Sequence, residues 1–426
     1  MILMVASSLL VPAAGILTAP ILAQALGAEG RGAVAAALAP GLLAVSIATL
    51  GLPEALTFYL AKHPRVTRVA VAWSSAVAAV LGAVCLIAVF LALPFLSVGD
   101  ADLADLIMLA TALVIPALVV NMMRGAATGR QMWTAVALER VANAILRIAG
   151  LGVLFILGEL TVLTAVLVSS IAPLVAGVVY WKLFTRPPRH EVDEPLAGPL
   201  AKLLLTFGSR VWIGAVASMV YARLSQIIMA PLSNLTELGL FVVAITIADV
   251  PLIVAFTIQG TLFGVNSKTT NAAQITATSR ISLLVGAVGC LVIGVSLPAW
   301  IGPVFGAEFT DATVPTWLLL LAAVISLPGL MAAAGLGAWG RPGLRSLGLI
   351  VTLLVNVPLF VLLVPAWGAV GAGWAGIAGN VAMTLFNVLA ASRVMTVPPS
   401  AFFALNSGDI RQVRHEVRRL VRRGRK

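Results

Sequence analysis

The chain has few charged residues and few of the residue types that build metal or disulfide sites. Asp, Glu, Lys and Arg together make up 10% of its 426 residues, against 61% for hydrophobic residues. A soluble core could not bury so much apolar surface, so this composition excludes an ordinary water-soluble globular protein. The two cysteines and three histidines are scattered, which excludes a disulfide framework and a metal site of regular ligand spacing.

The sequence also lacks the motifs of common membrane-associated enzymes and ATP-driven pumps. It contains no P-loop, no HExxH sequence and no hydrophilic stretch large enough for a nucleotide-binding domain. We therefore expect no cofactor, no metal and no enzymatic activity. Any transport would draw on an ion gradient or on the concentration difference of the substrate itself.

Twelve apolar runs follow one another along the chain. Each is long enough to cross a hydrocarbon layer of about 30 Å as a helix that rises about 1.5 Å per residue. The sequence therefore predicts an all-α polytopic membrane protein with 12 transmembrane helices. The expected spans lie near residues 2–26, 33–60, 69–96, 103–123, 141–158, 162–184, 207–230, 238–263, 280–305, 312–336, 345–365 and 371–395.

Lysine and arginine lie on every second hydrophilic break between these runs. That alternate set of breaks holds 25 of the 27 basic residues; Arg31 lies in the other set and Arg223 within an apolar run. Because cytoplasmic loops accumulate Lys and Arg, we expect a multi-pass protein of the cytoplasmic (plasma) membrane with both termini in the cytoplasm. The net charge of +11 reflects this topology, and no nucleic-acid partner is expected.

The longest polar interruption begins at Arg186 and ends at about Pro199, and it divides the predicted helices into six and six. The end of the chain alternates apolar residues with arginines at helical spacing, which predicts a basic amphipathic helix on anionic membrane lipids. The predicted parts are an N-terminal six-helix bundle at 1–185, a cytoplasmic linker at 186–206, a C-terminal six-helix bundle at 207–395 and the basic tail at 396–426.

The two halves share a weak internal similarity. The sequence GAEGRGAVAAALA at 27–39 aligns with NLTELGLFVVAITIA at 234–248, and this alignment places Gly32 over Gly239. Halves of six helices each have the same orientation in the membrane. They would be related by an axis along the membrane normal, an arrangement that builds a central cleft between two bundles.

Ionisable side chains within the spans are the first candidates for function, because they are costly in a bilayer. Arg223 and Asp249 are expected at almost the same depth, about 18–21 Å from the outer end of their helices. Either they form a structural ion pair, or both face a wet cleft and serve substrate binding or proton coupling. Glu54 is a third candidate, near the cytoplasmic end of its span.

Three further arginines, Arg124, Arg147 and Arg210, are expected within a turn or two of the cytoplasmic ends of their spans. Each alone is explained by a side chain that extends to the lipid headgroups. Together they would suit an anionic substrate such as a pyrophosphate, because guanidinium binds phosphate oxygens in bidentate fashion.

Several stretches, taken in order, resemble the polysaccharide-biosynthesis flippases. These belong to the multidrug/oligosaccharidyl-lipid/polysaccharide exporter superfamily, which includes the O-antigen flippases. The resemblance covers about residues 10–395; one departure is Ser225, where relatives often carry an acidic residue. The stretches are ILTAPILAQALGAEGRGAVAAALAP, ATLGLPEALTFYLAK, LSQIIMAPLSNLTELGLFVVAITIADVP, VFGAEFTDA and PAWGAVGAGWAG.

The resemblance implies two six-helix bundles in a V-shaped, MATE-like arrangement around a central cleft. It implies a flippase that moves an undecaprenyl-pyrophosphate-linked oligosaccharide to the outer leaflet by alternating access, for surface polysaccharide biosynthesis. Candidate partners are the lipid-linked oligosaccharide, anionic lipids, and a glycan polymerase or glycosyltransferases.

Two alternatives stay open. One is a cation-coupled multidrug exporter of the same superfamily. The other is a membrane glycan polymerase or glycosyltransferase. The second fits less well, because such enzymes usually place catalysis on a substantial external loop. The longest external break here has nine residues, from Ser97 to Asp105.

Overall fold

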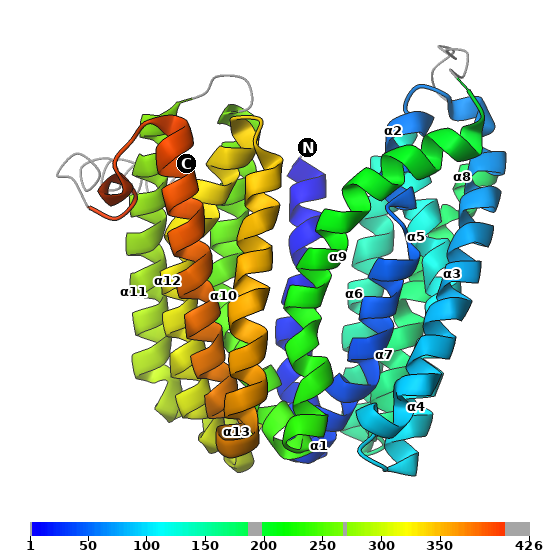
Figure 1. The fold of residues 1–426 in the computed structure, drawn as a ribbon. Coiled ribbons are helices and arrows are strands. Elements are labelled where there is room, and N and C mark those ends of the chain that lie inside the picture. Colours follow the sequence, from blue (N-terminus) through cyan, green and yellow to red (C-terminus); the bar gives the residue numbers. More distant parts are fainter. Residues whose placement is uncertain (1, 186–197, 267–270, 405–426) are drawn as a thin grey trace, which may run out of the picture. The chain divides into compact units, whose positions relative to one another are not determined.

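The computed structural model describes residues 2–185, 198–266 and 271–404 (Figure 1). Most of the predicted linker and most of the predicted basic tail lie outside these residues. The described chain is helical and contains no strand. Its α-helices are α1 (Ile2–Ala48), α2 (Leu52–Leu60), α3 (Thr67–Leu96), α4 (Ala101–Ala112), α5 (Val114–Gly129), α6 (Trp133–Leu157), α7 (Val162–Gly177), α8 (Lys182–Thr185), α9 (Leu200–Leu232), α10 (Leu235–Asn266), α11 (Ala272–Phe305), α12 (Thr313–Ala338) and α13 (Pro342–Met395).

Ten stretches of the described chain are long and apolar enough to cross a membrane. Two of them, in α1 and α13, contain a glycine with a non-helical backbone, Gly27 (φ 66°, ψ −174°) and Gly368 (φ 51°, ψ −129°). Glycine adopts a positive φ without steric strain, and in Figure 1 both α1 and α13 turn back along their own direction. When each of these two is counted as two spans, the described residues contain twelve, and the predicted fold class is confirmed.

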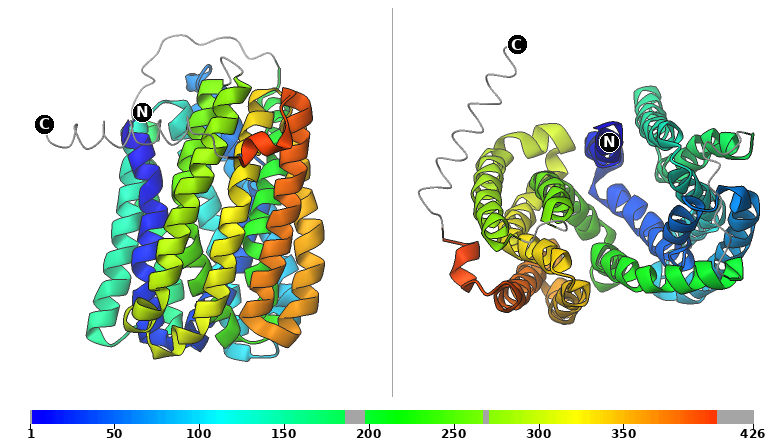
Figure 2. Two further views of the ribbon diagram at one scale, coloured as in Figure 1. Left: turned by 90° about the vertical axis from the view of Figure 1, so that its left-hand side faces the viewer. Right: turned by 90° about the horizontal axis from the view of Figure 1, so that it is seen from above.

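The chain forms two compact units. Unit 1 contains residues 1–242 together with 304–309, and unit 2 contains residues 243–303 and 310–426. The right-hand view of Figure 2 looks along the helices of each unit. These units follow the packing of the chain, and the predicted division into two six-helix bundles at the polar linker stays a prediction.

Unit 1 uses small residues to bring helices close together. A Cβ atom on Gly125 of α5 would lie 2.5 Å from the carbonyl oxygen of Pro53, and one on Gly129 would lie 2.8 Å from that of Thr57. The Thr57 hydroxyl also donates a hydrogen bond of 3.0 Å to the carbonyl of Gly125. This GxxxG spacing is typical of membrane helices, which associate through close backbone contact.

The first half of α9 packs on the break between α1 and α2. Gly51, at φ 66°, forms this break, and a Cβ atom there would lie 2.2 Å from the carbonyl oxygen of Gly208. The Phe207 ring stacks on Phe58 at 4.7 Å, and the Trp212 indole donates a hydrogen bond of 2.9 Å to the Ile47 carbonyl. The break is therefore covered by α9.

The predicted topology can be tested with two single cysteines at exposed alanines, in a background with Cys85 and Cys290 replaced. Ser97 would be a poor reporter, because it is only 4% exposed. We expect an impermeant thiol reagent to label Ala101→Cys on intact cells, and Ala61→Cys only after lysis, since Ala61 precedes Lys62 and Arg65. Labelling of Ala61→Cys from outside would contradict a cytoplasmic location of this loop.

Candidate functional site

Three arginines of unit 1 lie near one another: Arg31 on α1, Arg147 on α6 and Arg223 on α9. Arg147 experiences electrostatic repulsion from Arg223, and Arg31 experiences it from Arg147. Arg223 donates a hydrogen bond of 3.0 Å from Nη1 to Oε1 of Gln226, which is buried on the same helix. We call Arg31, Arg147 and Arg223 the arginine cluster.

The structure places Arg147 deeper than the sequence predicted. The predicted span began at 141, but α6 begins at Trp133. Arg147 therefore lies fourteen residues into the helix, about 21 Å from its start. The prediction that it sits within a turn or two of the cytoplasmic end was wrong. At this depth, extension of the side chain to the cytoplasmic headgroups does not explain it.

Sequence reasoning missed Arg31 as a site residue. The sequence predicts that Arg31 lies in a hydrophilic break, but α1 resumes its helix after Gly27 and includes Arg31 in the next turn. The signal was present in the charge pattern, because Arg31 is the one basic residue in the otherwise non-basic set of breaks. Such an exception to the positive-inside rule is a reason to expect a functional role.

The arginine cluster is suited to an anionic ligand. The Nε atoms of Arg31 and Arg147 are buried and have no hydrogen-bond partner within the described chain. Among the residues that the structure describes, no carboxylate forms an ion pair with Arg31 or Arg147. Like charges in an apolar span repel one another strongly, and an anion bound between them would offset that repulsion.

Arg124 has a different environment, because it is held by a carboxylate. Its Nη2 and Nε donate to the two oxygens of Glu139 at 2.9 and 3.2 Å. Nη1 donates to Asn121, and the Tyr180 hydroxyl lies 3.2 Å from Glu139 Oε2 as a further donor. Glu139 is 0% exposed. This geometry favours a structural pair that joins α5, α6 and the short 3₁₀ helix Val178–Trp181 that follows α7, and the predicted role of Arg124 in substrate binding stays a prediction.

The remaining candidates lie outside the arginine cluster. Glu54 is exposed in the first turn of α2, where a carboxylate stabilises the helix N-terminus. Arg210 is exposed on the first half of α9. Asp249 is exposed on α10 in unit 2, whereas Arg223 belongs to unit 1, and their predicted pairing stays a prediction.

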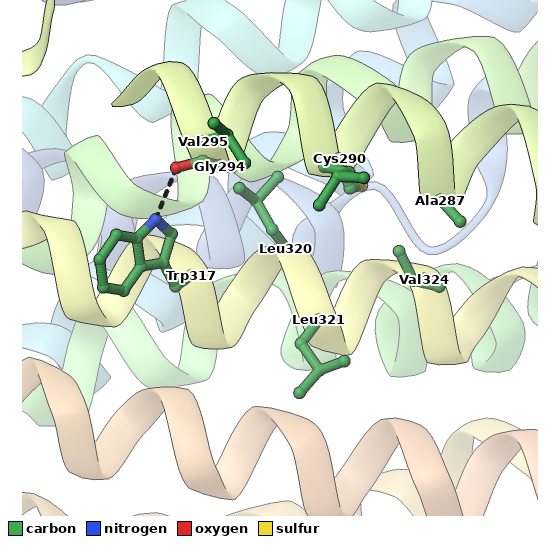
Figure 3. Close-up of a pocket in the computed structure, with 9 residues that line it drawn as sticks. Ala287, Cys290, Gly294, Val295, Trp317, Leu320, Leu321 and Val324 are labelled. Carbon is green, nitrogen blue, oxygen red and sulfur yellow. Dashed lines mark hydrogen bonds between the residues drawn. The ribbon is translucent and has the colours of Figure 1, made fainter. Parts of the chain in front are cut away.

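Unit 2 carries an apolar groove of about 410 Å³ between α11 and α12 (Figure 3). The Trp317 indole closes one side by donating a hydrogen bond of 2.8 Å to the Gly294 carbonyl. Leu291 and Val295 at its edge are 65% and 76% exposed. Its walls carry no ionised side chain, so it suits hydrocarbon and not an anion. Within the described residues, no cluster of His, Cys, Asp and Glu could hold a metal ion.

The sequence matches the model of the polysaccharide biosynthesis protein family over residues 1–270. Uncharacterized proteins of Mycobacterium tuberculosis (strain ATCC 25618 / H37Rv) and Mycobacterium bovis (strain ATCC BAA-935 / AF2122/97) are 29% identical over 224 residues, which cover 50% of this chain and 50% of theirs. The chain thus spans about half the length of the curated relatives it matches.

Two solved structures share the fold at low sequence identity. One is a multidrug resistance MATE family transporter of the MOP superfamily in an inward-facing conformation, with a TM-score of 0.70, 14% identity and coverage of 90% of this chain and 95% of that chain. The other is the lipid II flippase MurJ in an inward closed conformation, with a TM-score of 0.74, 9% identity and coverage of 94% and 89%. The predicted family and fold are confirmed: the chain belongs to the polysaccharide biosynthesis protein family and is a multi-pass membrane protein with the fold of MOP-superfamily transporters.

Proposed function

We propose that this protein is a flippase that moves a lipid-linked oligosaccharide across the cytoplasmic membrane by alternating access. The proposed substrate carries its glycan on undecaprenyl pyrophosphate, and both termini of the protein lie in the cytoplasm. The observation that carries the proposal is the arginine cluster of Arg31, Arg147 and Arg223 in the membrane-spanning part of unit 1.

A pyrophosphate diester matches this cluster in charge and in geometry. It carries two negative charges and several oxygens, and guanidinium groups bind such oxygens through paired, charge-assisted hydrogen bonds. Bound between Arg31 and Arg147, it would supply acceptors to two buried Nε atoms that have no partner in the described chain. The polyprenyl tail of such a substrate would stay in the bilayer while the glycan crosses.

The family supports the same proposal, because its members are described as polysaccharide biosynthesis proteins. The main alternative remains a cation-coupled multidrug exporter. Its substrates are typically cationic or neutral, and a cluster of buried arginines would disfavour cations in the same region. A glycan polymerase or glycosyltransferases remain candidate partners.

The test is complementation of a strain that lacks its own oligosaccharide flippase, with export normalised to the amount of protein in the membrane. Loss of one charged hydrogen-bond donor costs about 1.5–3 kcal/mol, or roughly 10- to 150-fold in affinity. We therefore expect Arg147→Gln and Arg31→Gln each to lower surface glycan at least tenfold at substrate-limited export and to raise the inner-leaflet precursor. The matched control, Arg345→Gln at an exposed arginine of α13 to which no binding role is assigned, should stay within twofold of the wild type.

Two outcomes would contradict the proposal. Full export by both cluster variants would remove the role of the cluster. A wild-type protein that raises drug resistance without restoring surface glycan would favour the exporter instead.

A further inference from the structure

The connection between α11 and α12 packs in unit 1, although the two helices that it joins lie mostly in unit 2. It runs from the end of α11 into a short 3₁₀ helix, Ala307–Ala312, and α12 begins at Thr313. Residues 304–309 belong to unit 1, whereas residues 243–303 and those from 310 onward belong to unit 2. We call residues 304–309 the strap. It lies within the stretch VFGAEFTDA, to which the proposed function gives no role.

The strap is hydrogen-bonded to the turn in α1. Oε2 of Glu308 accepts a hydrogen bond of 2.9 Å from the backbone N–H of Ala28. Gln24 donates a hydrogen bond of 2.8 Å from Nε2 to the Val304 carbonyl. A Cβ atom on Gly27 would lie 2.9 Å from Glu308 Oε2, so the carboxylate reaches this position because residue 27 is a glycine.

The local backbone explains why a carboxylate binds there. Gly27 interrupts the helix, and Ala28 begins the next helical segment with an N–H that has no carbonyl one turn before it. A negative charge at this point also interacts favourably with the helix dipole. Glu308 thus caps the second half of α1 from a position 280 residues away in the sequence.

The strap is held by hydrogen bonds of exposed side chains and by two buried aromatic rings. Gln24 and Glu308 are both exposed, so water can compete for their hydrogen bonds. Phe305 and Phe309 are only 4% and 0% exposed, and their ring centroids lie 6.3 Å apart. Burial of these two rings holds the strap in place, while the hydrogen bonds set where it sits.

We propose that the strap binds the turn in α1 reversibly. It is bound, or docked, in this structure and detaches during each transport cycle. The helices on both sides of the strap belong to unit 2, whereas the strap itself packs in unit 1, so any conformational change that separates the two units would act on the strap. Alternating access in transporters built from two repeats requires such movement. The inference rests on the transporter fold and does not depend on which substrate is carried.

The first test measures docking without any substrate. Ala28 is 2% exposed, so a cysteine there should react slowly with an impermeant maleimide in a background that lacks Cys85 and Cys290. We expect Glu308→Ala to raise the labelling rate of Ala28→Cys at least fivefold, and Glu308→Gln, which keeps an acceptor oxygen, to raise it less. Asp311→Ala removes an exposed carboxylate just beyond the strap and should leave the rate unchanged. Equal rates in the Glu308→Ala and Asp311→Ala backgrounds would overturn docking through Glu308.

The second test asks whether release is needed for transport. The double variant Gln24→Cys with Val304→Cys would be joined by a short, reducible bis-thiosulfonate, with each single variant treated in the same way. We expect cross-linking to lower transport at least tenfold and reduction to restore it. Transport at the uncross-linked rate by the cross-linked protein would overturn the proposal. If the wild type moves no lipid-linked oligosaccharide, the proposed function fails, whereas the labelling test still decides whether the strap docks.

Discussion

Replacing Arg124 by leucine should destabilise the protein more than replacing Arg124 and Glu139 together. The single change leaves the carboxylate of Glu139, which is 0% exposed, without its cation and with the Tyr180 hydroxyl as its remaining donor in the described chain. Removing one partner of a buried ion pair costs about 3–5 kcal/mol, and because Arg124 is 33% exposed we expect the lower end of this range. Thermal unfolding of the purified protein in detergent, followed by size-exclusion chromatography, measures the difference.

The double variant, Arg124→Leu with Glu139→Leu, should recover most of the lost stability, because two apolar side chains can replace an ion pair at little cost. Arg210→Leu is the control for loss of an exposed arginine, and its effect should be small. If the double variant is no more stable than Arg124→Leu, the pair does not act as a structural unit.

The membrane spans could be predicted because the signals that define them are local. A run of apolar residues and the alternation of lysine and arginine are both readable within about 20 residues, and the twelve predicted spans are present. The break in the second span could also be anticipated from Pro53, which follows the left-handed Gly51 at the start of α2. Proline fits the first turn of a helix and therefore marks a restart.

The start of α6 could not be predicted from hydropathy, because the charge of Glu139 near its start is paired with an arginine on another helix, α5. Glu139 and Arg140 lower the hydropathy of residues 133–140, so the sequence predicted a hydrophilic loop there. Arg124, fifteen residues earlier, neutralises Glu139 inside the protein. Hydropathy sums the residues of one segment and carries no information on such a partner. Because the predicted span began at 141 and not at 133, Arg147 was predicted near its cytoplasmic end, and the arginine cluster was not predicted.

The long-range contacts at the α1 turn could not be predicted from the sequence either. The alignment of the two halves paired Gly32 with Gly239 as equivalent positions, but it did not indicate that the two glycines contact each other. Likewise, nothing near Glu308 shows that its carboxylate caps a helix that begins at Ala28. Equivalence between repeats is visible in a sequence, whereas contact requires the packed structure.

Alanine at either of these two glycines should disrupt unit 1 severely. A Cβ atom on Gly32 would lie 1.8 Å from the carbonyl oxygen of Leu235, and one on Gly239 would lie 1.9 Å from that of Ala28. The obstacle in each case is backbone, which cannot rotate away as a side chain can, so the second half of α1 and the start of α10 must separate.

We expect Gly32→Ala and Gly239→Ala each to lower the free energy of unfolding by about 3 kcal/mol or more, the upper end for overpacking. Gly152→Ala provides the matched control, because a Cβ atom on this glycine of α6 meets nothing within 4 Å. That control should stabilise the protein by about 0.4–1 kcal/mol, since alanine restricts the unfolded chain. Thermal unfolding of the three variants beside the wild type distinguishes the cases. If Gly32→Ala and Gly239→Ala unfold at the same temperature as Gly152→Ala, the two backbones do not cross as closely as the structure places them.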